Sequence, residues 1–203
     1  MFEVDFYLHD SQRRIGIKNL FFFVKSKIPG VTMAVDGTHI KIMAPKRDKH
    51  LYYNRKGFSS LNVMIVCDHK MQIRYVCAKY PGSSHDSHIW DLSDMKSISA
   101  TNYRRGNANL ILGDKGYPLQ PWLITPFREP ITCLRKRRFN THHAKGRCCA
   151  LHNIRLNFNS NETFNEPYLD TTENEYSIDD DNDLDDMPTD EASRIRDSFL
   201  DIF

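Results

Sequence analysis

Five short apolar segments, interrupted once by a helical pattern, constrain the fold of this 203-residue chain more than any other feature. The polar sequence "DHKM" joins the second segment to the third as a hairpin. Residues 83–99 then place Ile89, Leu92 and Met95 at helical spacing. Such an order favours an α/β fold, a mixed sheet flanked by helices. The predicted strands are residues 31–43, 61–67, 72–78, 109–114 and 122–125.

Charge is divided unevenly along the chain. Residues 1–160 hold 26 Lys and Arg against 11 Asp and Glu, whereas residues 161–203 hold 2 against 15. The basic part indicates a polyanionic partner, with a plain solvated surface as the alternative. The acidic part has too few apolar residues to offset its ordering entropy. We expect a helical lead-in at 1–28, the folded domain at 29–156, a disordered acidic segment at 157–190 and a short C-terminal helix at 191–203.

Two carboxylates occur where strands are expected. Asp36 interrupts the apolar run "MAVDGTHIKI", and Asp114 closes "LILGD". An unpaired carboxylate in a sheet is costly to bury, and a bound divalent cation would compensate its charge. An ordinary turn or N-cap Asp remains the alternative for each residue. Together they indicate a metal site at the ends of neighbouring strands.

A third carboxylate, Asp86, lies in "YPGSSHDSHIW" between His85 and His88. Ser84 or Asp86 is a candidate N-cap for the following helix. The functional alternative makes Asp86 a metal ligand or its close neighbour, with His85 or His88 orienting it.

Five blocks of the sequence together resemble one known family. They are "IPGVTMAVDGTHIKIMAP", "YYNRKGFSSLNVMIVCDHKMQIRYVCAKYPGSSHDSHIW", "LILGDKGYPLQPWLITPFREP", "RFNTHHAKGR" and "ALHNI". They occur in the order found in the PIF/Harbinger transposases and the nucleases derived from them, and cover about residues 27–155. The resemblance implies a ribonuclease H-like fold and an enzyme that hydrolyses DNA phosphodiesters with Mg²⁺, or Mn²⁺ as a substitute, through an Asp-Asp-Glu triad.

The resemblance carries the first two triad members onto Asp36 and Asp114, and a further family Asp onto Asp86. The catalytic Glu does not transfer, because the helix that bears it in the family is missing around Gly146 to Cys149. We therefore expect a fold that is incomplete at its C-terminal side. A non-catalytic remnant that binds DNA or a protein is the alternative function.

Two basic groups are candidate DNA contacts. Arg55 and Lys56 lie in "YYNRKGF", which belongs to the family pattern, and "LRKRRFN" adds Arg135, Lys136, Arg137 and Arg138. The second group also resembles a nuclear-import signal. We expect DNA and a DNA-binding protein as partners, and a nuclear location with the cytoplasm as a second one. Because the longest apolar runs are far shorter than the roughly 20 residues that a bilayer requires, we expect no membrane association.

Overall fold

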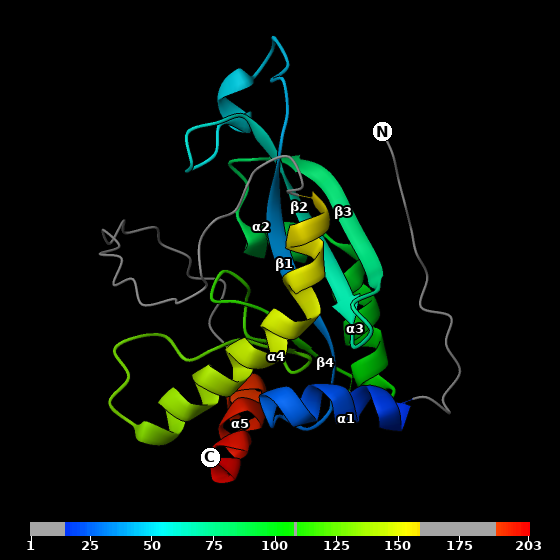
Figure 1. Cartoon of the computed structure of the whole chain (residues 1–203), viewed down its shortest axis with the longest axis vertical. Helices are drawn as coiled ribbons and strands as arrows, with labels where there is room; N and C mark the ends of the chain where they lie inside the picture. Colours follow the sequence, from blue (N-terminus) through cyan, green and yellow to red (C-terminus); the bar gives the residue numbers. More distant parts are fainter. Residues whose placement is uncertain (1–14, 108, 159–189) are drawn as a thin grey trace.

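A computed structural model describes residues 15–107, 109–158 and 190–203 as a five-stranded mixed sheet with helices on both faces (Figure 1). The strand order is β3-β2-β1-β4-β5. The pairs β1–β2 and β2–β3 are antiparallel, whereas β1–β4 and β4–β5 are parallel. The predicted α/β sheet is therefore confirmed. The strands are β1 (Val31–Lys41), β2 (Ser60–Asp68), β3 (Ile73–Pro81), β4 (Leu110–Leu112) and β5 (Leu123–Ile124).

The helices divide between the two faces. In Figure 1, α4 begins at the lower left, passes α5 and α1, and rises in front of β1 and β2, whereas α2 and α3 lie behind the sheet. The helices are α1 (Ile15–Ser26), α2 (Asp86–Asp91), α3 (Asp94–Arg104), α4 (Leu134–Phe158) and α5 (Asp190–Ser198), with short 3-10 turns η2 (Lys49–Tyr52) and η3 (Phe199–Ile202).

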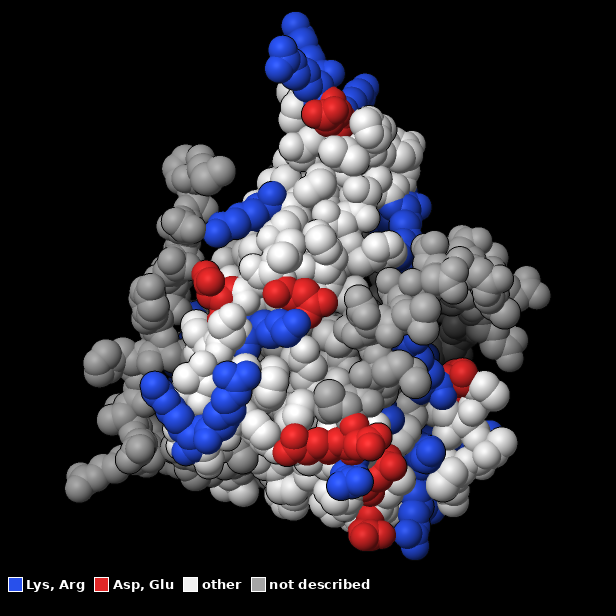
Figure 2. Space-filling view, turned by 180° about the vertical axis from the view of Figure 1, so that it is seen from behind, with Lys and Arg blue, Asp and Glu red and all other residues white. Residues whose placement is uncertain are grey.

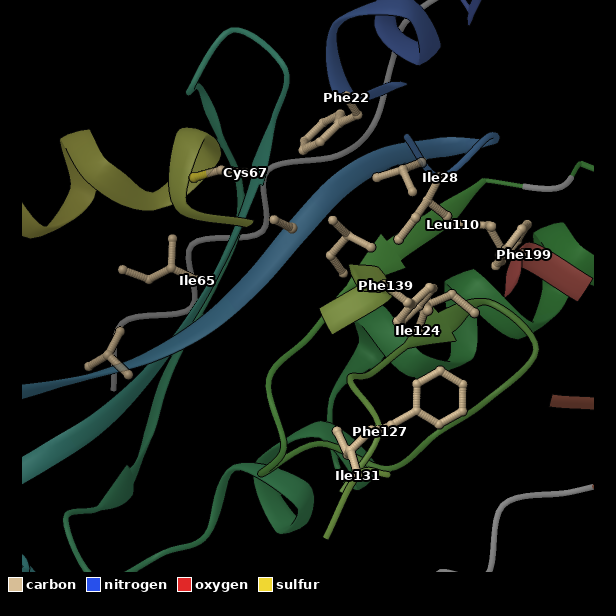
Figure 3. Close-up of a cluster of buried hydrophobic side chains, with 14 residues drawn as sticks. Phe22, Ile28, Ile65, Cys67, Leu110, Ile124, Phe127, Ile131, Phe139 and Phe199 are labelled. Atoms are coloured by element: carbon tan, nitrogen blue, oxygen red, sulfur yellow. The ribbon is translucent and has the colours of Figure 1, made fainter. Parts of the chain in front are cut away.

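The alternating side chains of β2 show why helices pack on both faces of the sheet. Val63 and Ile65 belong to the cluster under α1 and α4, whereas Met64 and Val66 belong to the cluster under α2 and α3. Successive side chains of a strand point to opposite faces, so a run without polar residues must be buried on both. Figure 3 shows the first cluster, in which Phe139 of α4 approaches the sheet.

The segment predicted as one helix at 83–99 is two helices. Helix α2 ends at Asp91, and Ser93 then caps α3 by accepting a hydrogen bond from the backbone N–H of Lys96 at 3.3 Å. Ile89 and Met95 are buried as expected, but Leu92 is 59% exposed. The break turns Leu92 away from the core, so its place in the helical pattern was misleading.

Helix α4 has no counterpart among the elements expected from the sequence. Among residues 134–148 of this helix, the buried ones are Phe139, His143 and Gly146, which recur at helical spacing. A Cβ at Gly146 would lie 2.6 Å from the Cβ of Ser26 and 2.9 Å from Cδ1 of Leu112. Glycine thus allows α4 to approach α1 and β4 closely, but a face built from His and Gly carries little hydrophobic signal.

The predicted terminal regions lie partly outside the described residues. This applies to 1–14 of the lead-in and to 159–189 of the acidic segment. At the C-terminus, α5 begins at Asp190, and Ala192 and Phe199 are buried. Within the described ranges, no helix has both the length and the apolar character needed to span a bilayer.

Candidate acidic site

Three separate elements contribute the carboxylates singled out in the sequence. Asp36 lies inside β1 and pairs with Ile65 of β2. Asp86 is the first residue of α2, and Asp114 follows the end of β4. All three residues are partly buried.

A glycine inside β1 shows how closely β1 and α2 approach. Gly37 pairs with Met64, so Asp36-Gly37 is an extended strand segment, and the turn interpretation of Asp36 is wrong. A Cβ at Gly37 would lie 2.4 Å from Oδ1 of Asp86 and 3.1 Å from Oδ1 of Asn62. Only a residue without a side chain leaves room for Asp86 at this point of the strand.

Asp86 and Asp114 approach each other across Gly116. A Cβ at Gly116 would lie 3.1 Å from Oδ1 of Asp114 and 3.3 Å from Oδ2 of Asp86. The backbone N–H of Gly116 donates to Oδ1 of Asp114 at 2.8 Å. The two carboxylates therefore share one small space at the end of β4.

Asp86 is held by Asn62 of β2. The Asn62 amide nitrogen donates to Oδ1 of Asp86 and to the carbonyl of Ser84, both at 2.9 Å. Burial raises the pKa of Asp86, and the negative charge of Asp114 raises it further, against the opposing effect of the Asn62 hydrogen bond. The N-cap position of α2 belongs to His85, so the N-cap interpretation of Asp86 and of Ser84 is also wrong.

Tyr117 is a buried residue whose pKa responds to the acidic residues. Its ring is 2% exposed, and its hydroxyl has no hydrogen-bond partner among the described residues. Burial raises the pKa of Tyr117 well above its ordinary value, and the charges of Asp86, Asp36 and Asp114 add to this effect. The three carboxylates thus act on one buried hydroxyl, although 78 positions separate Asp36 from Asp114.

A cation from α4 enters the same region. Nη1 of Arg147 lies 3.4 Å from Oδ2 of Asp114, and the two side chains are 22% and 33% exposed. The Arg147 charge also opposes the rise in the pKa of Tyr117. Sequence analysis missed this residue, because its role depends on α4 folding back across the sheet.

The donor chemistry of this region fits a hard divalent cation. Three carboxylates provide the oxygen ligands that Mg²⁺ prefers. The buried Oδ1 of Asn62 has no hydrogen-bond partner in the described part of the chain, so a further oxygen acceptor is available beside Asp86. As arranged here, however, no group of three or more His, Cys, Asp or Glu side chains among those residues is close enough to hold a metal ion.

The two predicted auxiliary histidines have different surroundings. His85 directly precedes Asp86 in the chain, and its Nδ1 lies 2.9 Å from Nη2 of Arg55. His88 packs edge-on against Tyr80, with 5.9 Å between ring centroids. The structure therefore places His85, rather than His88, between a basic residue and the acidic site.

Arg55 and Lys56 lie in a projecting loop between β1 and β2, residues 42–59. The same loop carries Lys46, Arg47 and Lys49, all exposed, around the single acid Asp48. Figure 2 shows this basic group at the narrow end of the molecule. Sequence analysis missed these three residues, although "KRDKH" is a visible signal. We call residues 42–59 the basic loop.

The basic loop is fixed to the segment that leads into α2. Asn54 is buried and accepts hydrogen bonds from the backbone N–H groups of Lys56 at 2.9 Å and Phe58 at 3.3 Å. The backbone N–H of Ser83 donates to the carbonyl of Leu51 at 3.1 Å. The loop therefore has a defined position relative to Asp86.

The other predicted DNA contacts, residues 135–138, lie in the first turns of α4, at the opposite end of the molecule (Figure 1). Several of them bind other parts of the chain. Nη1 of Arg138 donates to the carbonyl of Phe203 at 3.1 Å, and Nε of Arg137 donates to the carbonyl of Ile131 at 2.9 Å. This group thus helps to hold the C-terminal segment.

Comparison with known proteins supports the resemblance. The rat protein "Putative nuclease HARBI1" (Rattus norvegicus) is 35% identical over 123 residues, which are 61% of this chain and 35% of that protein. The human protein of the same name (Homo sapiens) is 33% identical over 123 residues, 61% of this chain and 34% of that protein. "Protein ALP1-like" (Arabidopsis thaliana) is 30% identical over 134 residues, 59% of this chain and 33% of that protein.

The chain spans about a third of the length of these relatives. No solved structure matches it significantly. Residues 35–161 match the family model described as DDE superfamily endonuclease, and this range includes all three acidic residues of the site. Because that match covers more than half of the chain, the predicted family is confirmed, and the protein belongs to the DDE superfamily endonucleases.

Proposed function

We propose that the chain is a metal-dependent DNA nuclease with a ribonuclease H-like core that is incomplete at its C-terminal side. The strand order and the mixture of antiparallel and parallel pairs support this core. Family membership supports the reaction class. The observation that carries the proposal is the position of Asp86, which lies close both to Gly37, the neighbour of Asp36 in β1, and to Asp114 across Gly116.

Asp36 and Asp114 are the proposed principal ligands of Mg²⁺ or Mn²⁺, with Asp86 as an additional ligand. A pair of such ions would supply an activated water and stabilisation of the leaving oxygen. Asn62 orients the carboxylate of Asp86 through its hydrogen bond, and Gly37 leaves space for that carboxylate. Tyr117 is buried next to Asp114, to whose carbonyl its backbone N–H donates at 3.3 Å.

The basic loop is the proposed contact to the DNA backbone, with Arg55 and Lys56 joined by Lys46, Arg47 and Lys49. No ion pair neutralises these five side chains within the described ranges. Since β1 rises about 3.3 Å per residue, the loop begins roughly 20 Å along the strand from Asp36. That separation is well under one turn of duplex DNA, so one bound duplex could contact both regions. Residues 135–138 are a secondary proposed contact.

Plasmid cleavage tests the nuclease proposal. The purified chain should nick plasmid DNA in Mg²⁺ or Mn²⁺, and Asp36→Asn should abolish the activity. Asp91→Asn is the matched control, because Asp91 is an exposed carboxylate of α2 that pairs with Lys96. Cleavage that persists at the wild-type rate in Asp36→Asn would overturn the proposed site.

A non-catalytic DNA-binding protein is the second candidate function. The Arg147–Asp114 ion pair favours it, as does the missing catalytic Glu of the family pattern. In that case no cleavage occurs, but DNA affinity falls steeply as salt rises. Replacing Lys46, Arg47 and Lys49 with Ala should reduce the slope of log affinity against log salt by about 2–3, whereas Lys70→Ala should leave it near the wild-type value.

We also propose a nuclear location and a DNA-binding partner protein. The basic sequence at 134–140 supports the nuclear location. A fluorescent fusion of the chain tests this location, compared with the same fusion in which four basic residues are replaced by Ala: Arg135, Lys136, Arg137 and Arg138.

A further inference from the structure

One side chain of α4 occupies a decisive position beside the acidic site. Gly146 brings α4 against Ser26 of α1 and Leu112 of β4. The next residue, Arg147, therefore lies near the end of β4. Asp114 is the second residue after that strand. The Arg147 guanidinium pairs with Asp114 at 3.4 Å while remaining only 22% exposed.

The partner of this guanidinium, Asp114, is one of the residues proposed to hold metal. Asp36 and Ala34 both occupy even-numbered positions of β1, and Ala34 belongs to the cluster on the face covered by α4. Strand alternation therefore directs Asp36 toward the face from which Arg147 approaches. Asp114 also lies close to Asp86 across Gly116, and two such carboxylates in a partly buried space repel each other unless a cation is present. Arg147 supplies such a cation from within the chain.

We propose that Arg147 is a built-in counter-ion that competes with divalent metal for the acidic site. This inference rests on the proposed metal site. Oδ1 of Asp114 accepts from the backbone N–H of Gly116 and Oδ2 pairs with Arg147, so a metal ion bound at Oδ2 would displace the guanidinium. The ion pair therefore sets the free metal concentration at which the acidic site becomes occupied.

Direct binding of Mn²⁺ to the full chain, measured by isothermal titration calorimetry and by the electron paramagnetic resonance signal of free Mn²⁺, tests this. Arg147→Gln should bind Mn²⁺ about tenfold more tightly or better, because a positive charge beside the site is removed. Arg147→Lys keeps the charge and should stay within about threefold of wild type. Lys145→Gln is the matched control, since Lys145 is an exposed cation of the same helix, and it should match wild type.

Arg147→Glu is a second variant, for which we expect a larger gain in Mn²⁺ affinity than for Arg147→Gln. It places a carboxylate where the guanidinium stood. Near-UV circular dichroism confirms that each variant is folded. If Arg147→Gln and Arg147→Glu bind Mn²⁺ no more tightly than wild type while Asp114→Asn abolishes binding, the counter-ion role is wrong and the metal site stands. If no variant binds Mn²⁺ at all, both the counter-ion role and the proposed metal site are wrong.

Discussion

Gly37→Ala tests whether Asp86 is packed against β1 as described. The new Cβ would lie 2.4 Å from Oδ1 of Asp86, closer than any normal contact, so the carboxylate must move. Loss of its hydrogen bond from Asn62 costs about 1–3 kcal/mol. An off-rotamer side chain adds about 0.5–1.5 kcal/mol. Ala recovers about 0.5–1 kcal/mol over Gly in a strand interior. We expect a net loss of about 1–3 kcal/mol in the free energy of unfolding.

Urea unfolding in EDTA, followed by circular dichroism, measures this loss. The decisive comparison is a double-mutant cycle with Asp86→Ala. When the carboxylate is absent, Gly37→Ala should cost less than about 1 kcal/mol, because its closest contact is gone. An equal loss in both backgrounds would show that Asp86 does not restrict position 37. Mn²⁺ affinity should also fall in the single variant, because the carboxylate leaves its place.

Three further predictions concern stability. Burial lowers the pKa of His143 to about 4, so His143 stays neutral in the folded chain while the unfolded chain takes up a proton below about pH 6.5. The free energy of unfolding should therefore fall by about 2 kcal/mol between pH 7.5 and pH 5, and His143→Gln should reduce this slope, as measured by urea midpoints. Arg74→Ala should cost about 1–2 kcal/mol in urea unfolding, because Asp68 is 2% exposed and accepts from Nε of Arg74 at 2.7 Å. Phe199→Ala should cost about 2–3 kcal/mol and speed proteolysis of the C-terminal segment, since Phe199 is buried in the core under α4.

The sequence predicted the sheet well because its signals are local. Strands β2, β4 and β5 carry continuous runs of apolar residues, and β2 and β3 are joined by a short polar turn. The positions of Asp36 inside a strand and of Asp114 after one were also predictable, and a carboxylate in or beside a buried strand conflicts with its surroundings. The conflict marks a position where charge is retained despite the cost of burial.

The remaining features depend on contacts between distant segments. Gly37 looks like half of a turn in the sequence, and only the approach of Asp86 from α2 explains a glycine inside a strand. His143 lies on the buried face of α4 because its ring nitrogen can donate to the carbonyl of Ile124 at 2.9 Å. Such a partner is invisible in a hydrophobic pattern, which explains why α4 was missed.

Two cations act on the acidic site from different sides. Arg147 pairs with Asp114 from α4, whereas Arg55 of the basic loop contacts His85, the neighbour of Asp86. The charges of His85 and Arg55 both favour the ionised form of Asp86, against the raised pKa that burial gives it. The acidic site therefore lies between cations from two separate elements, α4 and the basic loop.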